Sequence, residues 1–346
     1  MSLHSQQCHC DPFVPQGRKW AGIRRRALAQ QRQLGGHMTK DRTLLGIGLM
    51  LAFCVLAPML DASSKLATAT IPVGQIVAAR FVVQGALMIP VALAMGLTWR
   101  VSARVGWLLA LRALLLIAST YSFVAAVAVM PMADALAIAF LSPLILLILG
   151  HFVFGNHVGP RRIAAAIVGF AGALMVIQPS LQTYGTATFY AIACAFAFAF
   201  YMAVTQTIGP LMHPVTQQLH TSLVGAAVIV PVLWAMDGAG GGGILASLDP
   251  VMPQGIAWLW LFGVGFWAAV AHMCMTLSLR FAPASTLAPL HYFEMVVSVA
   301  LGYLIFGDFP NLVTWGGIVL IVGAGLYIIQ REHALAARLS GQTQTP

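Results

Sequence analysis

Three neighbouring side chains in an otherwise apolar stretch could bind a solute or a proton. Glu294 is the only acid deep inside an apolar run, and His291 and Tyr292 lie in the preceding helical turn. His291 and Glu294 share a helical face, because three positions separate them. A charge at the bilayer centre costs about 2.5–3.5 kcal/mol on insertion scales, so Glu294 should face a cavity or a partner.

Two interpretations of Glu294 remain open. In the first, Glu294 binds a cationic substrate group or carries a coupling proton. In the second, it forms a structural ion pair with Arg80 or Arg112. Arg80 itself either attracts an anionic substrate or anchors a helix through the carbonyls of a neighbour. Arg112 lies near the end of an apolar run, where a long side chain can snorkel to the interface.

Aromatic and hydroxyl side chains within other apolar runs suit a solute with a flat ring. Stacking on aromatic rings binds planar molecules without demanding charge, although core packing is the alternative for each of them. The candidates are Tyr121, Ser122, Tyr201 and Trp267.

No catalytic, metal or cofactor site is expected from the sequence. Cys8, His9 and Cys10 are closer together than the ligands of known zinc sites. His272 to Met275 occupy consecutive helical positions, which point in different directions and cannot jointly hold one ion; we interpret them as packing residues. No Gly-x-x-x-x-Gly-Lys-Ser/Thr phosphate-binding loop occurs, so the chain has no such means of using ATP.

The composition places the chain in a membrane. Hydrophobic residues make up 60% of the 346 residues and charged residues only 8%, whereas soluble domains carry about 25% charged residues. A surface with so few charges cannot face water. The net charge of +9 comes from residues at the N-terminus and between apolar runs. That placement favours contact with anionic membrane lipid and not nucleic acid.

Ten apolar runs are long enough to cross a bilayer, which needs about 20 residues per helix. We therefore predict an all-α polytopic membrane protein with ten transmembrane helices. With a cytoplasmic N-terminus, the segments inside hold most Lys and Arg residues and those outside hold only Lys65, so both termini should be cytoplasmic. The runs are 44–63, 73–96, 106–129, 133–154, 162–179, 187–208, 216–236, 255–279, 284–306 and 312–330.

An internal repeat relates the two halves of the chain. A shift of 152 residues aligns the fourth and fifth runs with the ninth and tenth, and pairs Pro131 with Pro283 and Phe154-Gly155 with Phe306-Gly307. Five helices in each half is an odd number, so the second half should be inverted. Inverted halves can exchange between two states around a site near the membrane midplane.

The repeat divides the chain into four segments. Residues 1–40 are interpreted as a disordered basic leader or a start-site artefact, because Met38 opens an ordinary beginning. Residues 41–180 and 187–332 form the two five-helix repeats, and residues 333–346 are expected to be a disordered tail. Glycines in the fifth and tenth runs predict close helix contact, within one chain or in a homodimer.

Several short motifs within residues 40–335 carry a family resemblance. They are Arg80, Pro131 to Ala135, Leu141-Ser142-Pro143, Phe154-Gly155, Ala282 to Pro289 and Phe306-Gly307-Asp308. Together they resemble the EamA-type ten-helix members of the drug/metabolite transporter superfamily. Family members commonly have Glu where this sequence has Asn156 and Asp308, a departure that concerns local packing more than transport.

The resemblance implies a secondary active transporter in a bacterial cytoplasmic (inner) membrane. It would move a small organic metabolite by alternating access and would not be an enzyme, and it would be coupled to protons if Glu294 carries one. The second-half motifs favour a nucleoside-like or vitamin-like solute, or an amino-acid derivative. The alternative is a membrane-embedded transferase, for which only His291 and Glu294 form a tight pair of candidate groups.

Overall fold

The computed structural model describes residues 40–97, 100–142, 144–146, 148–149, 160–238, 240, 242–281, 290 and 293–342. Within these ranges the chain is helical and contains no strand. The predicted leader therefore lies almost entirely outside the described residues. The helices are α2 (Lys40–Ala67), α3 (Val73–Ala94), α4 (Ala103–Val127), α5 (Met132–Ala139), α7 (Pro160–Tyr184), α8 (Thr188–Ile208), α9 (Pro214–Met236), α10 (Ile244–Leu248), α11 (Ala257–Phe281), α13 (Phe293–Phe306) and α14 (Leu312–Gln342).

Most of the predicted apolar runs coincide with helices of the structure. Within the described residues, six segments are long and apolar enough to cross a membrane. Large apolar side chains also remain on the outside of the bundle: Trp234 is 82% exposed and Leu312 is 90% exposed. A water-soluble protein would not leave so many such side chains uncovered. The protein is therefore a polytopic helical membrane protein.

Local sequence signals set several helix ends. Pro72 precedes α3 and Pro131 precedes α5, each in an extended conformation that suits the residue before a helix. Ser102 caps α4 by accepting a hydrogen bond from the backbone N–H of Val105 at 3.5 Å. Pro214 begins α9, where its missing N–H costs no helical hydrogen bond.

The fourth predicted span is broken, although the sequence predicts one helix over 133–154. α5 ends at Ala139, and a turn follows at Phe140 and Leu141. Proline explains the position of the break. Pro143 has no N–H to bond the carbonyl of Ala139 four residues earlier, and its ring disfavours helix there.

The end of the chain also differs from expectation. α14 continues to Gln342, whereas the sequence predicts a disordered tail from residue 333. The segment Arg331 to Arg338 consists mostly of Ala, Leu, Arg and Glu, all strong helix formers. These propensities extend the last helix beyond its apolar part.

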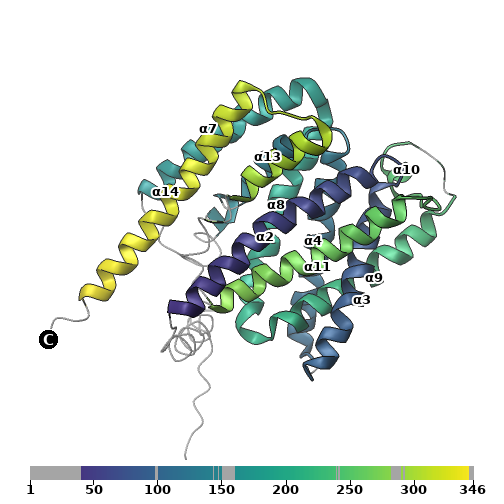
Figure 1. Ribbon diagram of the computed structural model, residues 1–346, viewed down its shortest axis with the longest axis horizontal. Coiled ribbons are helices and arrows are strands. Elements are labelled where there is room, and N and C mark those ends of the chain that lie inside the picture. The colour runs from purple at the N-terminus through teal and green to yellow at the C-terminus, as the bar shows by residue number, and fades with distance from the viewer. Residues whose placement is uncertain are drawn as a thin grey trace, which may run out of the picture.

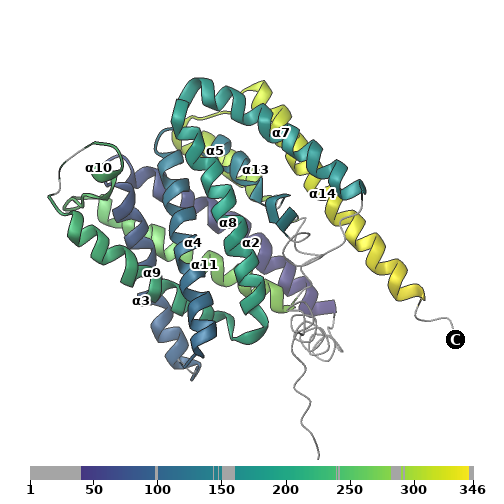
Figure 2. The same ribbon diagram turned by 180° about the vertical axis from the view of Figure 1, so that it is seen from behind.

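Contacts between the two halves follow a symmetric pattern. The first helix of each half packs against the third helix of the other half: α2 lies on α11, and α8 lies on α4. The second helices, α3 and α9, pack on each other, and so do the fifth helices, α7 and α14. Figures 1 and 2 show α7 and α14 side by side along one edge of the bundle. Exchanging the halves leaves this pattern unchanged.

Equivalent helices of the two halves run in opposite directions. Where α3 meets α9, Gly74 lies against Leu233 and Gly85 lies against Ser222, so residue numbers rise along one helix and fall along the other. The contacts of Gly169 with Ala324 and of Gly172 with Gly317 show the same for α7 and α14. The two halves are therefore inverted relative to each other. These α7 and α14 glycines also make their close contact within one chain.

Candidate functional site

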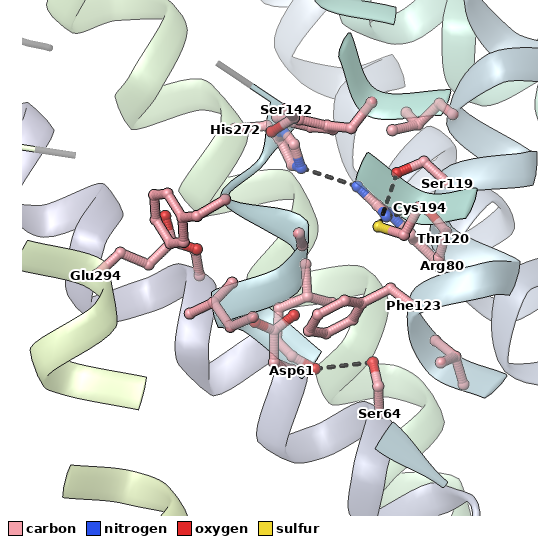
Figure 3. Close-up of a pocket in the computed structure, with 18 of the residues that line it drawn as sticks. Asp61, Ser64, Arg80, Ser119, Thr120, Phe123, Ser142, Cys194, His272 and Glu294 are labelled. Carbon is pink, nitrogen blue, oxygen red and sulfur yellow. Dashed lines mark hydrogen bonds between the residues drawn. The ribbon is translucent and has the colours of Figure 1, made fainter. Parts of the chain in front are cut away.

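A cavity of about 120 Å³ lies where helices of both halves meet. We call it the Arg80 cavity. Its volume has room for several water molecules, because one water needs about 10–15 Å³ on this measure. Helices α2, α3, α4, α5, α8, α11 and α13 contribute its walls, so both halves enclose it. The polar side chains that line it are Asp61, Ser64, Arg80, Ser119, Thr120, Ser142, Cys194, His272 and Glu294 (Figure 3).

Arg80 is the cation of this cavity. It lies two turns into α3 and is only 6% exposed. Its guanidinium donates hydrogen bonds to the hydroxyl of Thr120 on α4 and, at 2.8 Å, to Nε2 of His272 on α11. One of the two predicted roles for Arg80 was to anchor a helix through backbone carbonyls. Both of these bonds go to side chains and not to carbonyls. Arg80 instead joins α3, α4 and α11 through side chains at the cavity.

The hydrogen bond from Arg80 determines which ring nitrogen of His272 carries the proton. A guanidinium can only donate, so Nε2 of His272 must accept, and the proton of the neutral ring is on Nδ1. The sequence interpretation gave His272 a packing role because its neighbours are Met and Cys. That interpretation is incomplete, because the ring packs edge-on against Phe53 and also accepts a hydrogen bond from Arg80.

Two carboxyl groups line the same cavity. Glu294, in the first turn of α13, is buried, as the sequence predicts for an acid that faces a cavity. Arg80 and Arg112, the expected ion-pair partners, donate hydrogen bonds to Thr120 and His272 and to Tyr201, respectively. The second carboxyl group belongs to Asp61, which the sequence analysis did not single out. Asp61 lies six residues before the end of α2 and faces the cavity (Figure 3).

Small polar groups and aromatic rings complete the walls. Ser119 and Cys194 are in contact at 3.4 Å between α4 and α8. Phe140 lies in the turn that follows α5 and Ser142 comes directly after that turn, so the break in the fourth span lies at the cavity wall. Carriers commonly use such discontinuous helices at their binding sites. The rings on the cavity wall are Phe53, Phe123, Phe140 and Phe198.

The other aromatic candidates lie away from the Arg80 cavity. Tyr121 bonds the hydroxyl of Ser247 on α10 and makes edge contact with Tyr190. Ser122 is half-buried and is not among the residues that line the cavity. Trp267 packs in an apolar cluster between α2, α3 and α11. His291 and Tyr292 lie outside the described residues.

Arg112 forms a second polar centre and does not snorkel as expected. It is 3% exposed and donates to Thr205 at 2.9 Å, to Tyr201 at 2.6 Å and to Gln218 at 3.3 Å, as well as to Thr221. Tyr201, another predicted site residue, is therefore a partner of Arg112, and its ring lies 4.6 Å from the guanidinium carbon. We call these five residues the Arg112 network. It joins α4 of the first half to α8 and α9 of the second.

A salt bridge joins the halves near the end of α2. Nζ of Lys65 lies 2.6 Å from Oδ2 of Asp308, in the segment between α13 and α14. The ammonium also donates to the carbonyl of Met130 at 3.2 Å and lies 4.6 Å from the Phe306 ring centre. Lys65 follows Ser64 directly, so this contact lies beside the Arg80 cavity. Along the chain, Arg112 precedes the cavity residues of α4, which begin at Leu116, and Met130, which Lys65 contacts, follows them, so the two contacts lie on opposite sides of the cavity.

No metal centre is evident in the part of the chain that the structure describes. Within those residues, no group of three His, Cys, Asp or Glu side chains is arranged to hold an ion.

Two inverted helical halves around a buried polar cavity define a class of protein, the membrane transporter built on an inverted repeat. The comparison with known proteins specifies the class further. The chain belongs to the EamA-like transporter family, within the drug/metabolite transporter superfamily, and matches that family over residues 44–178 and again over 185–330. One match falls in each half of the chain.

Similar proteins are named as transporters of different solutes. The S-adenosylmethionine uptake transporter of Rickettsia conorii is 25% identical over 289 residues, which cover 84% of this chain and 94% of that protein. The riboflavin transporter of Rhizobium johnstonii is 26% identical over 61% of this chain and 66% of its own length. The pseudopaline exporter CntI of Pseudomonas aeruginosa is 26% identical over 58% of this chain and 66% of its own length.

A solved crystal structure shares the fold. It is 22% identical in sequence, has a TM-score of 0.58, and the match covers 84% of this chain and 97% of the other. Taken with the family match, these findings show that the chain is a small-molecule transporter and not an enzyme.

Proposed function

We propose that this protein is a secondary active carrier that moves a small organic metabolite through the Arg80 cavity by alternating access. The observation that carries the proposal is the cavity itself, which holds one guanidinium and two carboxyl groups between inverted halves. Charged groups in a membrane interior are costly, and they are retained where a solute or ion must bind. The transporter names of the relatives support an organic solute that is nucleoside-like, vitamin-like or derived from an amino acid.

Two polar contacts between the halves supply the elements that alternation requires. The Lys65–Asp308 salt bridge joins them at one end of the bundle, and the Arg112 network joins them towards the other. A carrier must break contacts at one end when the cavity opens there, while it keeps those at the other end. We place the Lys65–Asp308 end outside, with both termini in the cytoplasm, because of the Lys and Arg distribution.

We further propose that Glu294 carries the coupling proton. Two carboxyl groups in one buried cavity repel each other when both are charged, and a proton or a bound cation relieves that repulsion. Asp61 lies within electrostatic range of Glu294. Binding of a substrate and release of the proton are thereby linked. The titratable and charged groups around Glu294 are Asp61 and Cys54 on α2, Arg80 on α3, Cys194 on α8 and His272 on α11.

Transport into liposomes tests the carrier function. The full chain would be reconstituted with a panel of S-adenosylmethionine, riboflavin and amino-acid derivatives, with and without an imposed proton gradient. We expect at least one solute to enter and its rate to depend on the gradient. If no solute of this panel moved, the proposed solute classes would be wrong.

A variant at position 294 tests the coupling. Glu294→Gln should remove gradient dependence while the protein still reaches the membrane. Asp237→Asn is the matched control, because Asp237 is exposed, directly follows α9 and is not among the residues that line the cavity. Uptake by Glu294→Gln that still responded fully to the proton gradient would remove Glu294 from the mechanism.

A further inference from the structure

We infer that the substrate is a zwitterion, whose carboxylate binds at Arg80 and His272 and whose cationic group binds at Asp61. The inference rests on the proposed carrier function and specifies the class of solute for the same cavity. Figure 3 shows the two ends: Arg80 and His272 lie in the upper part of the view, and Asp61 lies below them.

Two residues at the first end of the cavity, Arg80 and His272, carry donor atoms that no described protein group engages. Nε of Arg80 and Nδ1 of His272 are buried, and neither has a hydrogen-bond partner among the described residues. Both atoms carry a hydrogen, since the His272 proton is on Nδ1. A buried donor without a partner costs about 1–3 kcal/mol, and a charged acceptor removes that cost. Two N–H donors beside a guanidinium charge suit a carboxylate.

The second end of the cavity has an acceptor that the protein leaves unused. Among the described residues, no hydrogen bond or ion pair engages the carboxyl group of Asp61, although the group faces the cavity. Glu294 lines the same cavity and lies within electrostatic range of Asp61. An ammonium or sulfonium group is the solute group that a buried carboxylate binds best, because an isolated buried charge is costly.

The two ends act on one molecule because they share one small cavity. Asp61 and Arg80 are within electrostatic range of each other but make no direct salt bridge. A ligand with a single charge satisfies one end and leaves the other uncompensated. A zwitterion satisfies both and adds no net charge to the membrane interior. Its uncharged part would contact the rings of Phe53, Phe123, Phe140 and Phe198.

Binding to matched ligands tests the inference. The purified full chain in lipid nanodiscs would be titrated with methionine, phenylalanine and S-adenosylmethionine, and with each molecule lacking its carboxylate or its amine. Thermal stabilisation and calorimetry give the affinities. At least one complete molecule should bind, and removal of either group should weaken its binding tenfold or more. The inference fails if no complete molecule binds or if a one-charge analogue binds as well.

Variants of Arg80 and Asp61 test which group of the solute binds at each end of the cavity. Arg80→Gln should bind the complete molecule and its decarboxylated analogue equally weakly, and Asp61→Asn should likewise lose the preference for the amine. Arg104→Gln and Asp237→Asn, both at exposed positions, are the controls and should keep both preferences. Retention of both preferences by the Arg80 and Asp61 variants would overturn the assignment. The comparison of ligands on the unmodified protein remains decisive if a variant does not fold.

The outcome is separable from that of the carrier function. Gradient-driven uptake of riboflavin, without binding of any complete zwitterion, would overturn this inference and leave the carrier intact. A zwitterion that binds with the expected preferences but never crosses liposomes would overturn the carrier function alone.

Discussion

The Lys65–Asp308 salt bridge should control how often the cavity opens at its end of the bundle. Asp308→Asn keeps the shape of the side chain and removes its charge. Lys65 then retains its hydrogen bond to the Met130 carbonyl, and Asp134 remains within electrostatic range of it. The variant therefore weakens one contact between the halves and leaves the surrounding helices in place.

The free-energy change expected for Asp308→Asn follows from how far the two charged side chains are buried. The Lys65 and Asp308 side chains are 16% and 28% exposed, so the pair is neither fully exposed nor fully buried. Exposed pairs contribute about 0.2–1 kcal/mol, and breaking a fully buried pair costs about 3–5 kcal/mol. We expect about 1–2 kcal/mol here, which changes the ratio of two states by a factor of about 5 to 30.

Thiol labelling measures that ratio. Ser64 lines the cavity next to Lys65 and is buried in this state. Ser64→Cys, in a chain whose five native cysteines are replaced, should react with a membrane-impermeant maleimide about 5 to 30 times faster when Asp308→Asn is added. Asp237→Asn should leave the rate unchanged. An unchanged rate in Asp308→Asn would show that the pair does not hold this state.

Two further predictions concern the packing of the halves. Gly225→Ala should lower the free energy of unfolding by about 1–3 kcal/mol, because its new Cβ would lie closer than 3.0 Å to ring carbons of the fully buried Phe81. Thermal unfolding in detergent measures this loss, and Gly48→Ala, with nothing within 4 Å, is the control; equal midpoints would contradict the packing of α3 on α9. Arg112→Met should cost about 1–3 kcal/mol by the same assay, because Tyr201 and Gln218 lose a charged donor. Arg112→Lys should be destabilising too, since one ammonium cannot replace three donor nitrogens. A lysine variant as stable as the native protein would show that the positive charge alone, without the three separate donors, is sufficient.

Part of the candidate site could be predicted from single residues. Glu294 and Arg80 are charges in apolar runs, and the cost of such charges directs them towards a cavity, where the structure has them. The polar contact of His272 and the position of Asp61 in the cavity were not predicted, because the sequence around each is ordinary for packing or for a helix end. Their neighbours in the chain do not reveal that α11 and α2 face Arg80.

Arg112 is a further residue whose contacts the local sequence did not reveal. Its place near the start of α4 suits snorkelling, and nothing adjacent in the sequence opposes that interpretation. Its partners are Thr205, Tyr201, Gln218 and Thr221, which come from α8 and α9 about ninety or more residues later in the chain. Helix packing alone brings them to it.

The amino-acid sequence by itself determined the helices, their membrane environment and the inversion of the halves. Hydrophobic runs of fixed length form helices in a bilayer because backbone groups must bond within the segment, and an odd number of helices per half reverses the second half. Only the tertiary structure decided which polar groups meet. Arg80 bonds His272 across 192 residues of chain, and Lys65 pairs with Asp308 across 243. Such contacts depend on which helices pack together and on how each is rotated, and apolar periodicity specifies neither when both lipid and protein faces are hydrophobic.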